Sequence, residues 1–129
     1  DLQIEVPALS AADMVLPAPA EGSREVGVRV ARAREMQRQR FAALGAARVR
    51  TNAECSGHIL EQIATPDAEG TALLRQAADT LLLSARGFHR TLRVARTLAD
   101  LDGAERVGRM HVAEALSYRG ETLRQNRAA

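Results

Sequence analysis

Three arginines that lie close together in the sequence, Arg86, Arg90 and Arg93, could act on one anion. If the segment is helical, at about 100° per residue, these arginines share one side of the helix with Thr97. The opposite side is apolar and consists of Phe88, Leu92, Ala95, Leu98 and Ala99. Because a planar guanidinium group matches the geometry of a phosphate, this row suits a polyanion such as a nucleotide triphosphate or a nucleic-acid backbone.

The ends of this expected helix place Arg86 next to its amino terminus. Ser84 is a suitable N-cap, and Asp102 with Gly103 forms a suitable stop. Arg86 then lies in the first turn, where free N–H groups and the positive end of the helix dipole also attract a phosphate. The alternative is that Arg86 is a solvated or salt-bridged surface residue.

The other arginines of this segment leave several possibilities open. Arg90 and Arg93 could line the same anion site, contact a neighbouring subunit, or form salt bridges with acids such as Asp79 or Glu105. Arg96 lies off the row, and its expected local partner is Asp100, four residues later.

A second group of arginines lies in a helix expected at 24–43, which contains six of them. Arg34 and Arg38 in this helix could contact DNA phosphates or a neighbouring subunit. The alternative is a solvated face on which the arginines pair with Glu21, Glu25 and Glu35. The apolar stripe of this helix is expected to contain Val26, Val30, Ala33, Phe41 and Leu44, with Gln37 inside it.

The overall composition limits the classes of function. All 18 lysine-or-arginine positions are arginine, yet the net charge is only +2. Any contact with nucleic acid must therefore come from a local patch. Phe41, Phe88 and Tyr118 are too few aromatic residues for a surface on which single-stranded bases stack. No run of about 18 apolar residues predicts a membrane span.

The positions of the histidines and of the single cysteine do not predict a metal site. His58, His89 and His111 are not spaced three or four residues apart, and no acid completes a ligand set. Cys55 is the single cysteine, so it cannot form an internal disulfide or bind zinc alone. We expect a buried or loop position in a reducing compartment.

The periodicity of apolar residues predicts a small all-α bundle of four or five helices. Besides the two helices above, helices are expected at 56–64, 66–82 and 109–125, with Thr65, Pro66 and Asp67 starting the second of these. Their expected inward residues are Ile59 and Ile63, then Leu74, Ala77, Ala78 and Leu81, and finally Val112, Leu116 and Leu123.

The chain begins with an alternating pattern. Leu2, Ile4 and Val6 alternate with polar residues, which is typical of a short strand that Pro7 would end. Without a sheet to join, this strand has no partner, and a linker rich in proline and alanine follows it. We therefore expect the first 20 residues to be loose.

Four segments together resemble one known family. LSARGFHRTLRVARTLADLDG at 83–103 and HVAEALSYR at 111–119 are similar to the C-terminal segment of the magnesium-chelatase-like AAA+ ATPases, the ComM/YifB group. DLQIEVP at 1–7 and RVARAREMQRQRF at 29–41 resemble two further segments of that family. The matches occur in the same order along the chain.

The resemblance implies a division of the chain and a role for Arg86. Residues 22–126 would form a helical lid domain, and residues 1–21 would be the strand and linker left from an upstream ATPase core. In related ATPases an arginine near the start of a lid helix, called sensor 2, touches the γ-phosphate and couples hydrolysis to lid movement. Arg86 matches that position, and Arg90 and Arg93 are secondary candidates.

The resemblance also implies the character of the full-length protein. It would be a cytoplasmic ATP hydrolase that uses ATP and Mg²⁺, forms a hexameric ring and processes DNA, as in branch migration during transformation. The chain itself has neither a GxxxxGK[ST] loop nor an acidic Walker B strand. We expect it to be monomeric, to hydrolyse no ATP and to bind no nucleotide tightly.

Two other functions remain open at this point. One is a free-standing helical module that binds DNA or protein without a nucleotide role. The other is a true magnesium-chelatase subunit. The sequence of 83–103 fits the ComM/YifB group better than the second alternative.

Overall fold

The computed structural model describes residues 2–17 and 19–119 and confirms the all-α class. The described part contains five α-helices, two short 3₁₀ turns and no strand. In chain order these are the turn η1 (Asp13–Val15), α1 (Ser23–Ala43), the turn η2 (Asn52–Glu54), α2 (Gly57–Ala64), α3 (Ala68–Thr80), α4 (Ala85–Leu101) and α5 (Arg109–Ser117). No helix among the described residues is long and apolar enough to cross a membrane.

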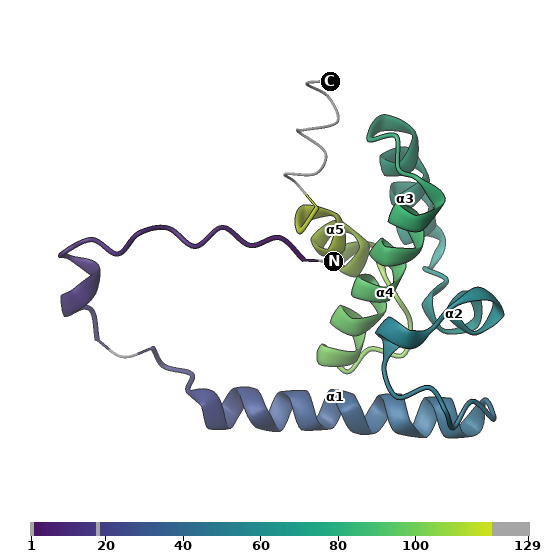
Figure 1. Ribbon diagram of the computed structural model, residues 1–129, viewed down its shortest axis with the longest axis horizontal. Coiled ribbons are helices and arrows are strands. Elements are labelled where there is room, and N and C mark those ends of the chain that lie inside the picture. Colours follow the sequence, from purple (N-terminus) through teal and green to yellow (C-terminus); the bar gives the residue numbers. More distant parts are fainter. Residues whose placement is uncertain (1, 18, 120–129) are drawn as a thin grey trace.

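Helix α4 is the centre of the bundle. It packs against α5, α1, α2 and η2, while α3 packs against α5. Figure 1 shows α1 as a long rod along one side of this body, with its amino-terminal half extending beyond it. The main contacts of α1, α2 and α5 with the rest of the bundle are therefore made through α4.

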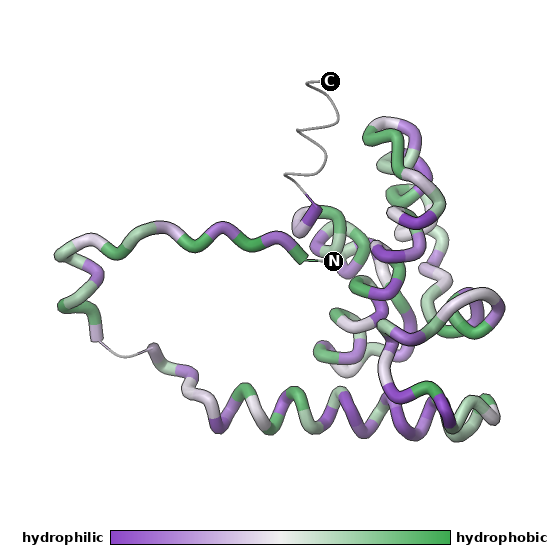
Figure 2. Tube along the Cα trace, in the orientation of Figure 1, coloured by the Kyte–Doolittle hydropathy of each residue, from purple (hydrophilic) through white to green (hydrophobic). Residues whose placement is uncertain are grey.

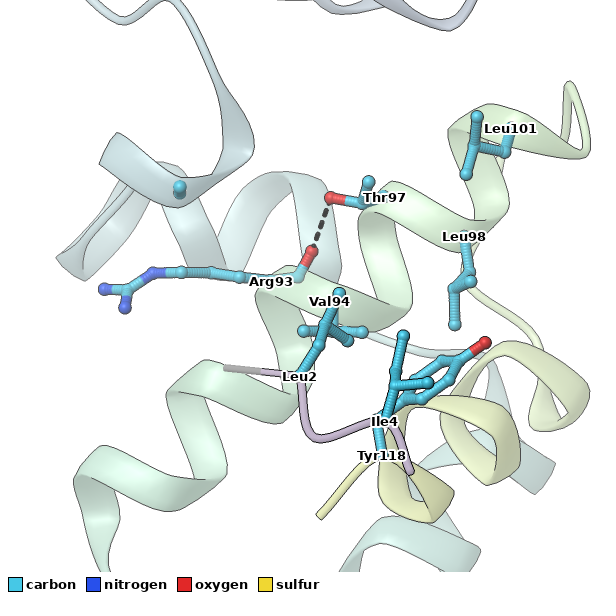
Figure 3. Close-up of a pocket in the computed structure, with 9 residues that line it drawn as sticks. Leu2, Ile4, Arg93, Val94, Thr97, Leu98, Leu101 and Tyr118 are labelled. Atoms are coloured by element: carbon cyan, nitrogen blue, oxygen red, sulfur yellow. Dashed lines mark hydrogen bonds between the residues drawn. The ribbon is translucent and has the colours of Figure 1, made fainter. Parts of the chain in front are cut away.

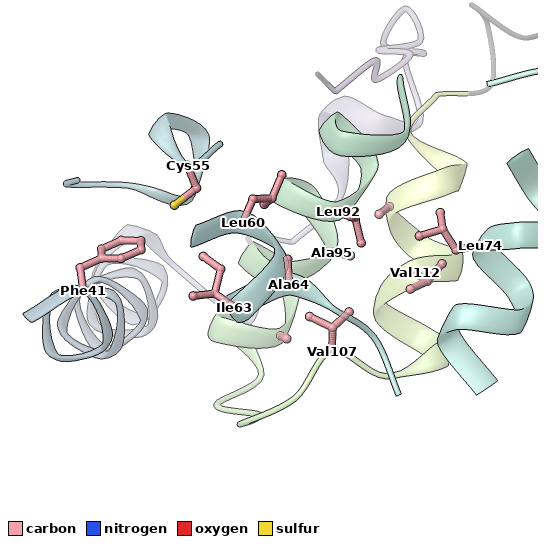
Figure 4. Packing of buried hydrophobic residues seen from close by; sticks show 12 residues of the cluster. Phe41, Cys55, Leu60, Ile63, Ala64, Leu74, Leu92, Ala95, Val107 and Val112 are labelled. Carbon is pink, nitrogen blue, oxygen red and sulfur yellow. The ribbon is translucent and has the colours of Figure 1, made fainter. Parts of the chain in front are cut away.

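The core contains medium-sized side chains from every helix. Figure 4 shows Leu60, Leu74, Leu92, Val107 and Val112 among them. On α4 the core positions include two alanines with no exposed surface, at 95 and 99. Such small residues let the neighbouring helices approach α4 closely, and each fully buried leucine or valine contributes about 1.5–3 kcal/mol.

The apolar stripe of α1 is buried only in part. Ala33, Gln37 and Phe41 are buried, as expected, whereas Val26 and Val30 are 38% and 45% exposed. Leu44, just beyond the helix, is also exposed. The physical reason is geometric: only the second half of this helix reaches α4, so the first half has nothing to pack against.

The start of α3 differs from the sequence prediction. Thr65 is not the N-cap. Instead the Asp67 carboxylate accepts a hydrogen bond from the Gly70 N–H at 2.7 Å. Pro66 lies outside the helix because it forms an isolated parallel bridge with Val107, which holds the backbone extended. The Asp67 N–H donates to the Val107 carbonyl at 2.9 Å.

Other boundaries shift by a few residues. Gly22 rather than Ser23 precedes α1, and its N–H donates to the Glu25 carboxylate at 3.0 Å. Helix α5 ends at Ser117, well before the expected 125. Partial burial replaces the burial expected at four positions: Ile59, Ala78, Leu81 and Leu116. Leu123 and the expected frayed tail lie outside the described residues.

The described part of the amino-terminal segment, 2–17 and 19–22, forms no strand. All described residues from 2 to 22 are exposed. One backbone hydrogen bond connects this segment to the bundle: the Gln3 N–H donates to the Tyr118 carbonyl at 3.0 Å. Figure 2 shows apolar residues recurring along this segment and along the outer half of α1. The alternation of Leu2, Ile4 and Val6 thus produces an extended chain without a sheet, because a strand needs a partner for its hydrogen bonds.

Candidate functional site

A tight turn after α3 fixes the amino terminus of α4. The Leu83 N–H donates to the Ala78 carbonyl at 3.0 Å, and Leu82 adopts a left-handed conformation with φ of 50°. The Ser84 hydroxyl then accepts a hydrogen bond from the Gly87 N–H at 3.1 Å, as predicted for an N-cap. Helix α4 therefore begins at the residue after the cap.

This start places Arg86 in the first turn of α4. Its side chain is exposed, and none of the described residues forms a hydrogen bond or ion pair with it. The first turn also contains no acidic residue. A cation at the positive end of a helix dipole is unfavourable, so the fold leaves a positive charge here without local compensation.

Arg119 joins the same end of α4 from a distant part of the sequence. A Cβ atom at Gly87 would lie only 3.2 Å from the Nη2 atom of Arg119, so this guanidinium covers the backbone at position 87. The Nε atom of Arg119 is buried and has no hydrogen-bond partner. Burial, and then the neighbouring charge of Arg90, lower the pKa of Arg119.

Three arginines therefore surround one helix terminus: Arg86, Arg90 and Arg119. Guanidinium groups and free backbone N–H groups suit an anion such as a phosphate. The row predicted from the sequence contains Arg86 and Arg90 but not Arg119. Helical spacing could not have found Arg119, because its position depends on how α5 packs against α4.

The third arginine of the predicted row is engaged elsewhere. The Nε of Arg93 donates to the Cys55 carbonyl at 2.8 Å, which ties α4 to the end of η2. Figure 3 shows the Arg93 side chain extending away from an apolar hollow beside it, while the Thr97 hydroxyl donates to the Arg93 carbonyl at 2.9 Å. Arg93 therefore has an acceptor within the chain, which is neither Asp79 nor Glu105.

The apolar hollow itself lies between α4, α5 and the amino-terminal segment. Its lining includes Val94, Leu98 and Tyr118, and Leu2 and Ile4 lie across it (Figure 3). The Tyr118 hydroxyl donates to the Glu114 carboxylate at 2.8 Å, and this hydrogen bond raises the pKa of the phenol. Tyr118 thus lines the hollow together with residues of α4, while Glu114 remains exposed.

A buried ionic cluster supports the middle of α4. Arg96 and Asp100 are each 1% exposed, and the Arg96 Nε donates to Asp100 Oδ1 at 3.0 Å. The expected local pair is confirmed, but it lies in the interior instead of on the surface. The remaining Arg96 donors reach the carbonyls of Ala104 at 2.7 Å and Glu105 at 2.9 Å.

The Asp100 carboxylate gathers donors from three elements. It accepts hydrogen bonds from Gln37 at 3.0 Å, from Asn52 at 2.8 Å and from Arg40, with which it also forms a salt bridge. Burial works to raise the pKa of Asp100, but these hydrogen bonds and the nearby arginines outweigh it and lower that pKa. The cluster therefore joins α1, η2 and α4 through one ionised carboxylate.

The two arginines predicted for DNA or subunit contact lie on another part of the surface. Arg34 and Arg38 are on α1, where Arg38 pairs with Glu35 and Arg29 pairs with Glu21. These pairs match the expected solvated face in part. Within the described residues, no three histidine, cysteine, aspartate or glutamate side chains are placed to hold a metal ion.

Comparison with known proteins identifies related chains. Residues 20–119 match the family model described as "Magnesium chelatase, subunit ChlI C-terminal". An uncharacterized protein of Mycobacterium tuberculosis is 46% identical over 112 residues, which cover 87% of this chain and 20% of that protein. "Competence protein ComM" of Haemophilus influenzae is 34% identical over 120 residues, covering 92% of this chain and 22% of the relative. YifB of Escherichia coli is 37% identical over 101 residues, which cover 78% of this chain and 19% of that protein.

The chain thus spans about a fifth of the length of the curated relatives that it matches. The family match covers most of the described residues and includes all five helices. Together with the all-α bundle, it shows that the chain belongs to the magnesium-chelatase C-terminal family, as a lid domain of the magnesium-chelatase-like AAA+ proteins of the ComM/YifB group.

Proposed function

We propose that this lid domain senses ATP bound to the AAA+ core of the same full-length protein, through Arg86 at the start of α4. The observation that carries this proposal is the charge of Arg86, which has no partner among the described residues and lies in a helix turn without an acidic residue. A γ-phosphate placed there would gain the guanidinium group and the helix dipole together.

Arg90 and Arg119 would strengthen the same anion site. Their guanidinium groups are close enough for the charge of Arg90 to lower the pKa of Arg119. An anion beside them would interact favourably with both positive charges. Arg93 would act differently, by holding α4 to the segment around Cys55 so that the row moves as one body.

The cations and hydrogen-bond donors at this site suit the phosphates of ATP and do not suit its Mg²⁺ ion. Mg²⁺ binds oxygen ligands such as carboxylates, whereas the first turn of α4 contributes cations and N–H groups. The Mg²⁺ that accompanies ATP would therefore be held by the AAA+ core. In this proposal the lid contributes charge stabilisation and mechanical coupling, and the core contributes the hydrolytic chemistry.

The wider role would be ATP-driven work on DNA by a hexameric ring in the cytoplasm. The support is the similarity to competence protein ComM of Haemophilus influenzae. Within such a ring the lid would contact the core of its own chain and a neighbouring subunit. The domain separated from that core would remain monomeric.

The test is ATP turnover by the full-length protein with Arg86→Ala, compared with the wild type at saturating ATP. Loss of one charged donor to a developing phosphate charge should lower kcat by about 100-fold. Arg106→Ala is the matched control, because Arg106 is exposed and lies outside the site. Arg119→Ala should lower kcat less. Unchanged turnover with intact assembly would remove the sensor role and favour a helical module without a nucleotide function.

A further inference from the structure

A second group of arginines surrounds a hollow formed by the second half of α1 and the segment that follows it. The hollow has a volume of about 400 Å³, and Arg34, Arg38 and Arg50 lie around it. Its apolar lining consists of Phe41, Ala42, Ala47 and Val49. None of these arginines belongs to the α4 terminus, so this hollow is separate from the proposed ATP-sensing site.

Arg34 is held in place by the buried ionic cluster. Its guanidinium donates to the Gln37 side-chain oxygen at 2.7 Å and to the Arg50 carbonyl at 2.9 Å. Gln37 is only 4% exposed and donates in turn to Asp100. This chain of hydrogen bonds fixes the guanidinium of Arg34 before any ligand arrives, which lowers the entropic cost of binding.

The charge around the hollow is unbalanced. Residues 32–54 contain six arginines and two glutamates, and Asp100 from α4 pairs with one of these arginines, Arg40. An excess of three positive charges remains in this segment, whereas the whole chain has a net charge of only +2. Arg38 pairs with Glu35, and Arg50 pairs with Glu54 at 3.5 Å. Among the described residues, no carboxylate contacts Arg34. The local excess is therefore available to an anion from outside the chain.

The surroundings indicate which kind of anion fits. Phe41 is the aromatic residue of the hollow, and it is only 1% exposed, so bases cannot stack on it. Three arginines around one hollow are typical of contacts to nucleic-acid phosphates, because protein–DNA interfaces are polar and strongly positive. An acidic protein segment is the alternative occupant, and competition with polyglutamate tests it.

We propose that Arg34, Arg38 and Arg50 bind the phosphodiester backbone of DNA without reading its sequence. Arg34 would give the fixed contact, and the exposed side chains of Arg38 and Arg50 would close around the phosphate from two sides. This surface gives the proposed DNA role a contact on the lid and so rests on that role.

The experiment measures binding of the chain to a fluorescently labelled 30-base-pair duplex by anisotropy, at 50 and 200 mM salt. Three phosphate contacts predict a loss of affinity of about 20- to 40-fold between these salt concentrations. The variant Arg34→Gln/Arg38→Gln/Arg50→Gln should bind at least about tenfold more weakly at low salt, and its slope against log salt should fall by about 2 to 3.

Two further variants make the test specific. Arg24→Gln/Arg75→Gln/Arg106→Gln removes the same charge from exposed positions elsewhere and should keep wild-type affinity. Arg38→Gln/Arg50→Gln leaves the Arg34 hydrogen bonds in place, so it should weaken binding even if the triple variant folds poorly. If the triple variant and the control lose the same affinity for the duplex, binding depends only on the overall charge of the chain, and the proposal is overturned.

Other outcomes separate this surface from the proposed function. If polyglutamate displaces the duplex as well as unlabelled DNA does, the hollow binds acidic protein and the DNA assignment is wrong. If the chain binds no duplex while the full-length protein binds it equally with and without the three substitutions, this surface fails and the DNA role survives. If the full-length protein binds no DNA, both fail.

Discussion

Arg96 and Asp100 form a buried ion pair in which each residue is only 1% exposed. The Arg96 Nε donates a hydrogen bond to Asp100 Oδ1 at 3.0 Å. The two residues lie one helical turn apart on α4. Asp100 also accepts hydrogen bonds from Gln37 and Asn52, which link α4 to α1 and η2. A buried charge of this kind stabilises the fold only while all its partners are present. The pair therefore makes the position of α4 dependent on a single carboxylate.

Asp100→Asn should destabilise the chain strongly. The substitution leaves the buried guanidinium of Arg96 without its counter-charge, and loss of one partner from a buried pair costs about 3–5 kcal/mol. The free energy of unfolding, measured in urea by circular dichroism, should fall by this amount. Asp79→Asn is the control, because Asp79 is exposed and should change stability by less than about 0.5 kcal/mol. A loss of under 1 kcal/mol for Asp100→Asn would contradict this account.

The same carboxylate should make the fold sensitive to acid. The pKa of Asp100 in the folded chain lies below its ordinary value of 3.8, so the unfolded chain binds the proton more readily. Stability from this group is then fully present above about pH 4 and is lost as the pH falls through the folded pKa. Thermal melts between pH 2 and 6 should show a lower Tm at the acid end. The decline should be shallower in Asp100→Asn, and identical slopes in the two proteins would be inconsistent with the prediction.

Arg86→Gln should stabilise the isolated chain. The substitution removes a positive charge from the positive end of α4, where none of the described acidic residues pairs with it. The expected gain is about 0.3–1 kcal/mol at low ionic strength, and salt should reduce it. Urea unfolding at two salt concentrations measures both effects, with Arg106→Gln as the control in a loop. A loss of stability would show that Arg86 has a structural partner, and would weaken the sensor proposal.

Leu82→Gly should also stabilise the chain. Leu82 has a φ of 50° and is 84% exposed, so the left-handed backbone strains this residue while its side chain buries little surface. Glycine adopts this conformation without the penalty of about 1–2 kcal/mol, although the unfolded chain gains freedom. A net gain of about 0.5–1 kcal/mol is expected in differential scanning calorimetry. Thr80→Gly, at the end of α3, should instead reduce stability, and two changes of the same sign would refute the strain argument.

The amino-acid sequence by itself determined the local structure. Ser84 with Gly87 and Asp102 with Gly103 specify the two ends of α4 through side-chain and backbone geometry that needs only a few neighbouring residues. Apolar spacing predicted the five helices for the same reason, and the family resemblance followed from contiguous motifs. Arg86 could be placed in its helix turn because the cap lies two residues before it.

Tertiary structure alone decided which polar groups come together. Arg119 covers Gly87 although 32 positions separate them, and Asp100 meets Gln37, 63 positions away, because α5 and α1 both pack against α4. Helical periodicity describes one element at a time, so it treated Arg96 and Asp100 as a local pair and could not show their burial. For the same reason, periodicity could not show that the first half of α1 is exposed. An apolar stripe is buried only where another helix packs against it.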